Sequence, residues 1–236
     1  MEFQQNELTA QVAATARDFA RLHIKPFVME WDEAQHFPID LFKELGQIGL
    51  MGVLVPEIYG GSGFGYQEYV DVIVEVSRVC GSIGLSLAAH NSLCTGHILA
   101  FGTEEQKQKW LPKMASGEAV TAIAMTEPGT GSDLQAVRTT AVLDGDEYVI
   151  NGSKIFITNG YLCDMAIVVC KTGNNEKGSA NLSLIIVEAD RVGFSKGKPL
   201  NKIGMKGQDT CELFFDNVRV PKANLLGMEG MGFIML

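Results

Sequence analysis

The spacing of apolar residues changes near Ala119, and this change constrains the fold more than any other feature of the chain. Up to about residue 118, apolar residues recur mostly at intervals of three and four, which is typical of amphipathic helices. From Ala119 onward the interval becomes two, and the turn dipeptide Asp144-Gly145 separates β-rich runs. The sequence therefore predicts an α+β protein, with an all-α domain over residues 1–118 and a small antiparallel β domain over residues 119–226.

The helical domain carries clear start and stop signals. A helix over residues 7–30 should be kinked or ended by Pro26, which lacks a backbone donor. The segment Thr103-Glu104-Glu105-Gln106 is a capping box that starts another helix, which Gly117 ends. Periodicity predicts three further helices, one from about residue 38, one over residues 66–80 and a mostly apolar one over residues 82–101.

The β domain is predicted from short runs between turn signals. Asp144-Gly145 and Asn151-Gly152 are both expected to form hairpin turns. Residues 221–226 are expected to leave the sheet, and residues 227–236 to begin a helix. The strand candidates are residues 119–125, 142–143, 148–150, 154–158, 165–170, 182–187 and 213–215.

Composition excludes several classes of function. The net charge of −9 and the pI near 5.0 disfavour nucleic acid as a partner, because phosphate binding needs a basic surface. No apolar run reaches the roughly 18–20 residues that a membrane span needs. The five cysteines include no C-x-x-C pair, which favours reduced thiols in the cytoplasm or a mitochondrial matrix. His90 and His97 flank Cys94, but packing is favoured over metal binding because no carboxylate lies nearby in the sequence.

Two neighbouring segments carry the chemistry-bearing side chains. Residues 124–133 contain Pro128 and two glycines between hydroxyl side chains, so this loop can turn N–H groups and hydroxyls toward a polar ring edge or a phosphate. Residues 155–160 place Phe156 and Thr158 in a short β run closed by a turn. An aromatic face beside a polar loop could hold a flat heterocycle, although either segment alone is more often purely structural.

The pairing of these segments resembles the acyl-CoA dehydrogenases. Met125-Thr126-Glu127-Pro128-Gly129-Thr130-Gly131-Ser132-Asp133 is followed by Asn151-Gly152-Ser153-Lys154-Ile155-Phe156-Ile157-Thr158-Asn159-Gly160 at the spacing of that family. Thr130 stands where Ala or Gly is more usual, and Phe156 where many members have Trp. The likeness runs from the first helix to the last residue, and the segment 207–215 looks most like the long-chain branch.

This resemblance implies a site for FAD in the β domain, which would be a barrel or sandwich. Ser132 would also touch a fatty acyl-CoA thioester, together with Ser179 in a nearby loop. Glu127 and Asp133 would hold the loop rather than act as acids. No catalytic residue and no metal ligand is expected in this chain. The implied cofactor-binding residues are Ile123, Ala124, Met125, Thr126, Gly131, Ser132, Phe156, Ile157 and Thr158.

The implied activity is α,β-dehydrogenation of a fatty acyl-CoA to the trans-2-enoyl-CoA, with electrons passing to an electron-transferring flavoprotein. Proton removal from Cα requires a carboxylate base, and a flavin must accept the hydride because no side chain can. The family carries its glutamate base in a C-terminal four-helix domain, which residues 227–236 would only begin. The chain by itself is therefore expected to bind FAD loosely and to turn over poorly.

Some readings stay open on the sequence alone. The apolar helix over 82–101 is either bundle core or the wall of an acyl-chain tunnel, and the sequence does not rank these. The chain could also be a non-catalytic acyl-CoA-binding or protein-binding module, or a flavin oxidase or monooxygenase.

The resemblance also implies a homo-oligomer, and apolar residues at the C-terminal end of this chain predict self-association. These apolar residues are Leu225, Leu226, Phe233, Ile234 and Leu236.

Overall fold

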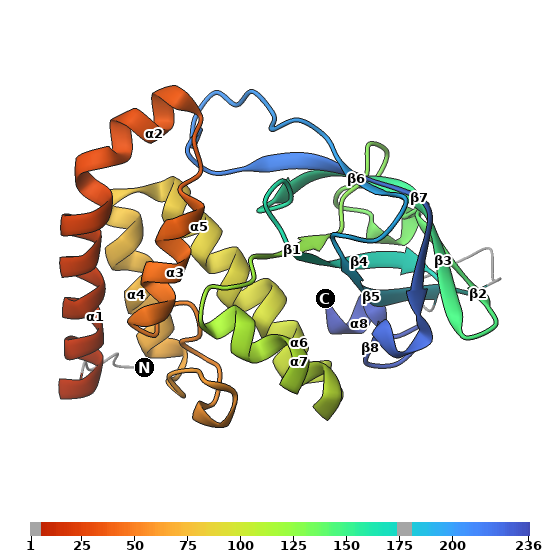
Figure 1. Ribbon diagram of the computed structural model, residues 1–236, viewed down its shortest axis with the longest axis horizontal. Helices are drawn as coiled ribbons and strands as arrows, with labels where there is room; N and C mark the ends of the chain where they lie inside the picture. The colour runs from red at the N-terminus through yellow and green to blue at the C-terminus, as the bar shows by residue number, and fades with distance from the viewer. Residues whose placement is uncertain (1–5, 174–180) are drawn as a thin grey trace.

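Residues 6–173 and 181–236 are described by the computed structural model, and they form a helical part followed by a sheet part (Figure 1). Figure 1 shows the helices on one side and the strands on the other, with α6 (Gly96–Phe101) and α7 (Glu104–Ala115) next to the sheet. The predicted α+β class with the helical domain first is confirmed. No helix of the described ranges is both long and apolar enough to cross a membrane.

Two of the predicted helices are each divided by a tighter or wider turn. The first passes through a π-helical turn (Ala20–Ile24) and a 3-10 turn that contains Pro26, because proline cannot complete the regular hydrogen-bond ladder. The helix predicted over residues 82–101 contains a π-helical segment, Ala89–Thr95. The remaining helices are α1 (Glu7–Phe19), α2 (Val28–Ala34), α3 (Ile39–Gln47), α4 (Tyr66–Val79), α5 (Gly81–Ala88) and α8 (Gly232–Met235).

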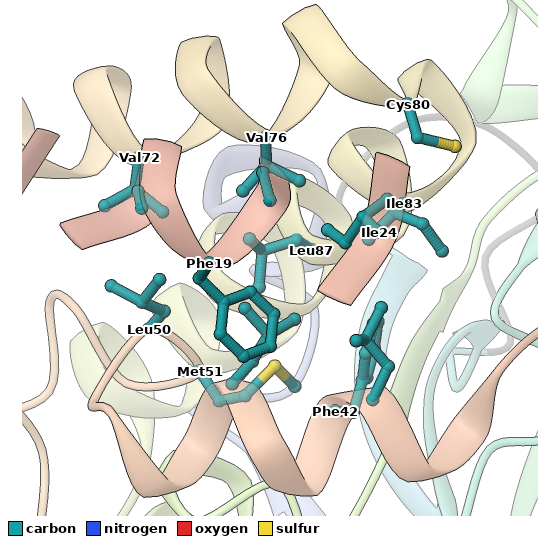
Figure 2. Close-up of a cluster of buried hydrophobic side chains, with 14 of the residues drawn as sticks. Phe19, Ile24, Phe42, Leu50, Met51, Val72, Val76, Cys80, Ile83 and Leu87 are labelled. Carbon is teal, nitrogen blue, oxygen red and sulfur yellow. The ribbon is translucent and has the colours of Figure 1, made fainter. Parts of the chain in front are cut away.

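Buried apolar side chains fill the space between α1, α3, α4 and α5 (Figure 2). In Figure 2 the ring of Phe19 lies among side chains that include Met51, Val76 and Leu87, the last three of which have no exposed surface. Burial of each such side chain contributes about 1.5–3 kcal/mol. This cluster holds the helical part together, and it also includes Val120, directly before the first strand.

The sheet part is one mixed sheet. Its strands follow the order β6-β7-β3-β2-β4-β5-β8, and β1 pairs with β4 off this path. Most pairs are antiparallel as expected, but β1 runs parallel to β4, and Thr140 at the start of β2 also pairs in parallel with Lys171 of β4. The strands are β1 (Thr121–Ala124), β2 (Thr140–Asp144), β3 (Glu147–Thr158), β4 (Met165–Lys171), β5 (Leu182–Glu188), β6 (Phe194–Lys196), β7 (Thr210–Pro221) and β8 (Leu225–Leu226).

Two predictions about the sheet were wrong. Asn151-Gly152 is not a hairpin turn, because β3 runs through it and pairs with β7, with a register shift between Ile150 and Gly152. Tertiary pairing here overrides a local turn signal. Residues 221–226 do not leave the sheet entirely, since Leu225–Leu226 pairs with β5. The hairpin at Asp144-Gly145 is confirmed, with β2 and β3 antiparallel on either side.

The helical part and the sheet part share buried contacts. His90, in the π-helical segment, is fully buried; its Nε2 lies 3.0 Å from the carbonyl oxygen of Met114 and its Nδ1 3.2 Å from Thr121 Oγ1. The Met114 carbonyl can only accept a hydrogen bond, so Nε2 carries the proton and Nδ1 accepts from Thr121. A long loop before β7 also reaches across to α2, where the Lys206 amide donates to Asp32 at 2.9 Å (Figure 1).

Candidate cofactor-binding seam

The loop 124–133 and the strand segment 155–158 lie side by side, and we call the two together the seam. The amide of Ile155 donates to the carbonyl of Thr126 at 2.9 Å, and the Thr126 hydroxyl donates back to the carbonyl of Ile155. These reciprocal hydrogen bonds join residues that are far apart in sequence. The sequence expectation that these two segments meet is therefore confirmed.

Phe156 is displayed on the surface of the seam by a β-bulge. The register of β3 against β7 shifts between Lys154 and Ile157, so that β3 carries one extra residue there. Phe156 takes up this residue with φ of 61°, a left-handed conformation that is unfavourable for a bulky side chain. As a result its ring is 66% exposed, although Ile157 beside it is buried.

The loop of the seam is held by hydrogen bonds within the chain, and its two glycines are exposed to solvent. Glu127 and Thr130 exchange backbone hydrogen bonds of 2.9 and 3.0 Å, and the Thr130 hydroxyl donates to the carbonyl of Ala136. Gly129 and Gly131 are exposed, and a Cβ added to either would meet no atom within 4 Å. Packing within this chain therefore does not require glycine at these positions, which leaves the backbone open to close approach by a ligand.

A buried ion pair lies beneath the loop. Lys154 Nζ is 2.9 Å from Glu127 Oε1, with side-chain exposures of 0% and 5%. Burial alone raises the pKa of Glu127, but hydrogen bonds from Thr139 and Arg138 and the Lys154 charge outweigh it, so the pKa is lowered overall. Glu127 accepts from the Thr139 amide and hydroxyl and from the Arg138 amide at 2.6–2.9 Å. The loop-holding role predicted for Glu127 is confirmed.

The predicted cofactor-binding residues fall into two groups. Ile123, Ala124 and Ile157 are buried in the apolar cores, so only their backbones could approach a ligand. The others are exposed or partly exposed residues of the seam, and their roles stay predictions. Ser179 lies outside the described residues. The accessible residues are Met125, Thr126, Gly131, Ser132, Phe156 and Thr158.

These residues fit a flat heterocycle that carries polar edge groups. Phe156 offers an exposed aromatic face, and the open loop offers backbone groups and the exposed hydroxyl of Ser132. The Thr126 hydroxyl already donates to Ile155, so toward a ligand it can serve as an acceptor through its remaining lone pair. The seam can therefore stack a ring and accept a hydrogen bond from a ring N–H.

Cavities lie both at the seam and away from it. One of about 250 Å³ lies between loop residues 127–129, the segment 138–139 and residues 152–153 of β3. A larger one of about 610 Å³ lies at Lys109, Glu188 and surrounding charged residues. That cavity is wide and lined by ion pairs such as Lys109–Glu188 at 2.7 Å, and it is not adjacent to the seam residues.

Sequence reasoning missed Lys154 and Thr139. A signal for Lys154 existed, since it lies on β3 between inward-facing positions, where a lysine is expected only with a partner. The partner could not be identified from sequence, because Glu127 is 27 residues away. Thr139 carries no local signal that separates it from any other threonine at the start of a strand.

Comparisons with known proteins agree with this geometry. Residues 6–118 match the family model "Acyl-CoA dehydrogenase, N-terminal domain", and residues 122–218 match "Acyl-CoA dehydrogenase, middle domain". The chain is 43% identical over 233 residues to a short-chain specific acyl-CoA dehydrogenase of Clostridium acetobutylicum, covering 99% of this chain and 61% of that protein. The chain thus spans about three fifths of the length of that curated relative.

Solved structures are similar over the same extent. An acyl-CoA dehydrogenase from Geobacillus kaustophilus matches with a TM-score of 0.96 and 42% identity, covering 100% of this chain and 62% of that one. A glutaryl-CoA dehydrogenase from Mycobacterium smegmatis, solved in complex with FADH2, matches with a TM-score of 0.90 and 32% identity, covering 97% and 58%. Identities at this level extend the likeness beyond the fold.

Proposed function

Because the chain belongs to the acyl-CoA dehydrogenase family, we propose that it is the helical and middle part of an FAD-dependent acyl-CoA dehydrogenase, and that its seam holds the flavin. The single observation that carries this proposal is the exposed ring of Phe156, displayed by a strained bulge directly beside the open loop. A bulky residue in such a conformation points to a functional demand rather than a packing demand.

The bound flavin would supply the hydride acceptor that no side chain can provide. Phe156 would stack on the ring system, and the Thr126 hydroxyl would accept from a ring N–H. Ser132, exposed at the far end of the loop, would reach the phosphates or the acyl-CoA.

Glu127 is not a candidate for the catalytic base. Both of its oxygens accept hydrogen bonds, its pKa is lowered, and Lys154 neutralises it. A base needs a free lone pair and a pKa closer to the working pH. The α-proton would therefore be removed by a carboxylate other than Glu127.

The substrate would be a fatty acyl-CoA, and the residues at 207–215 favour a long-chain thioester. The short-chain specific relative provides the competing expectation. Electrons would pass to an electron-transferring flavoprotein. The five cysteines are free and buried, which suits a reducing compartment such as the cytoplasm or a mitochondrial matrix. A homo-oligomer would be the working form.

Flavin titration tests the proposal. FAD fluorescence should be quenched on addition of the protein, and Phe156→Ala should weaken binding several-fold without unfolding the chain. Butyryl-, octanoyl- and palmitoyl-CoA should then perturb the absorption band of bound flavin, with the largest effect marking the preferred chain length. If the protein does not bind FAD, or if Phe156→Ala binds FAD as tightly as the wild type does, the seam is not the flavin site.

A further inference from the structure

The buried Glu127–Lys154 pair joins the two segments of the seam, because Glu127 belongs to the loop and Lys154 to β3. Lys154 Nζ donates to the carbonyl of Met125 at 2.9 Å as well as to Glu127. The next residue on β3, Ile155, makes the two hydrogen bonds to Thr126. Lys154 and its neighbour therefore hold three consecutive loop residues against β3.

Glu127 also holds a third segment, formed by Arg138 and Thr139. Its Oε2 accepts from the Arg138 amide at 2.7 Å, and its Oε1 accepts from the amide and hydroxyl of Thr139. Arg138 and Thr139 lie beyond the end of the loop, directly before β2. One carboxylate and one ammonium thus tie the start of the loop to β3 and to the segment that leads into β2.

Stability alone does not account for this pair. Removing two charges from water is costly, and a buried ion pair is often no better for stability than apolar side chains of similar size. A fully hydrogen-bonded pair does, however, fix the positions of its partners more narrowly than apolar packing does. Lys154 is completely buried, and two of the three N–H donors of its ammonium are paired, one with the carbonyl of Met125 and one with Glu127.

The pair also neutralises the buried carboxylate of Glu127 beneath the loop. Every hydrogen bond of Glu127 is directed inward, so the loop residues above it keep their outward groups for a ligand. If either partner lost its charge, the other would remain buried and uncompensated, and the loop would have to shift to admit water.

We propose that Glu127 and Lys154 are positioning residues that set the spacing between the loop and Phe156, and thereby the fit of the seam to a flavin. This inference rests on the proposed function for the identity of the ligand. Its structural part, the fixing of the loop, stands on the contacts alone. Neither residue is expected to touch the flavin itself.

The test uses Lys154→Met and the double variant Glu127→Gln/Lys154→Met, which leaves no uncompensated buried charge if the single variant fails to fold. The control is Arg219→Met, which removes ion pairs of 2.7 Å to Asp144 and Glu147 on the exposed side of the same sheet. Amide hydrogen exchange reports the loop, and FAD titration with the absorption spectrum of the bound flavin reports the seam.

In Lys154→Met and in the double variant, exchange of the hydrogen-bonded amides should accelerate at least tenfold, while β4 and β5 keep the wild-type rates; these amides are those of Glu127, Thr130, Arg138, Thr139 and Ile155. FAD affinity should fall at least tenfold and the flavin spectrum should change, whereas Arg219→Met stays within twofold on each measure. Unchanged loop exchange in the double variant would overturn the inference, as would unchanged FAD affinity. If the wild-type protein binds no FAD, the proposed function fails, and the exchange rates still decide whether the pair fixes the loop.

Discussion

Acid should destabilise this protein through His90, and the structure gives the size of the effect. The imidazole is fully buried between the helical part and the sheet part, where burial lowers its pKa to about 4 from 6.5, even though the hydrogen bond to the Met114 carbonyl opposes the shift. In the unfolded chain the same ring titrates at its ordinary value. As the pH falls below about 6.5, the unfolded state therefore binds a proton that the folded state does not.

The expected loss of stability follows from this difference. A group whose folded pKa is depressed contributes stability above its unfolded pKa and loses it as the pH falls toward the folded pKa. For His90 that window runs from about pH 6.5 to about pH 4. The loss amounts to about 3 kcal/mol, since each pKa unit is worth about 1.4 kcal/mol.

The assay compares urea denaturation of the wild type with that of His90→Gln at several pH values between 7 and 4. Glutamine can donate to Met114 and accept from Thr121, and it does not titrate. Other groups also change the free energy of unfolding with pH. Burial raises the pKa of Asp209 to about 6, so the contribution of Asp209 to stability increases as the pH falls. The difference between the two proteins removes these contributions.

Between pH 7 and 4 the wild type should lose about 3 kcal/mol relative to His90→Gln. The His90 ring should also show no titration by NMR until the pH approaches about 4. A difference that stays flat across this range, or a ring that titrates near 6.5, would refute the proposed burial and its hydrogen bonds.

Three further predictions can be checked separately. Gly46→Ala should lower the free energy of unfolding by more than about 2 kcal/mol in thermal or urea denaturation, because the added Cβ would lie 2.0 Å from the Ser116 carbonyl oxygen. Gly129→Ala should leave stability unchanged and weaken only FAD binding, because a Cβ there meets no atom within 4 Å. Phe156→Gly should be about 1 kcal/mol more stable than Phe156→Ala, because only glycine relieves the left-handed backbone; equal stabilities would show that no strain is stored. Of the residues predicted to drive self-association, Leu226 is buried and Leu225 half-buried, so sedimentation should detect self-association through the exposed Phe233, Ile234 and Leu236, and a monomer at high concentration would contradict it.

The elements that sequence predicted best are those fixed by local chemistry. The Thr103 capping box forms as predicted, with Thr103 and Gln106 exchanging side-chain hydrogen bonds. The kink at Pro26 follows from its missing donor. The seam was predicted because the pairing of its two segments resembles a known family, whereas the composition of either segment alone did not distinguish it from an ordinary loop or strand. In the first two cases the interacting groups lie close in sequence or carry a rare residue type.

What could not be predicted depends on pairings between distant residues. Asn151-Gly152 has the composition of a turn, yet the register of β3 against β7 keeps it in a strand. The π-helical segment around His90 arises where that helix packs against β1, a contact with no local signature. The parallel pairing of β1 with β4 likewise joins residues far apart in sequence, such as Thr121 and Met165.

The seam combines two features that a sequence selected only for folding would avoid. Phe156 occupies a backbone conformation that disfavours it, and it leaves its ring in water. Lys154 is a fully buried lysine in the middle of a strand. Local rules are usually broken where function demands it. Both exceptions lie in the three-residue stretch Lys154–Phe156 of β3: the Phe156 ring is exposed, and the buried Lys154 ammonium donates to Met125 and Glu127 of the loop. Their convergence on one short segment supports a binding role for the seam more strongly than either feature alone.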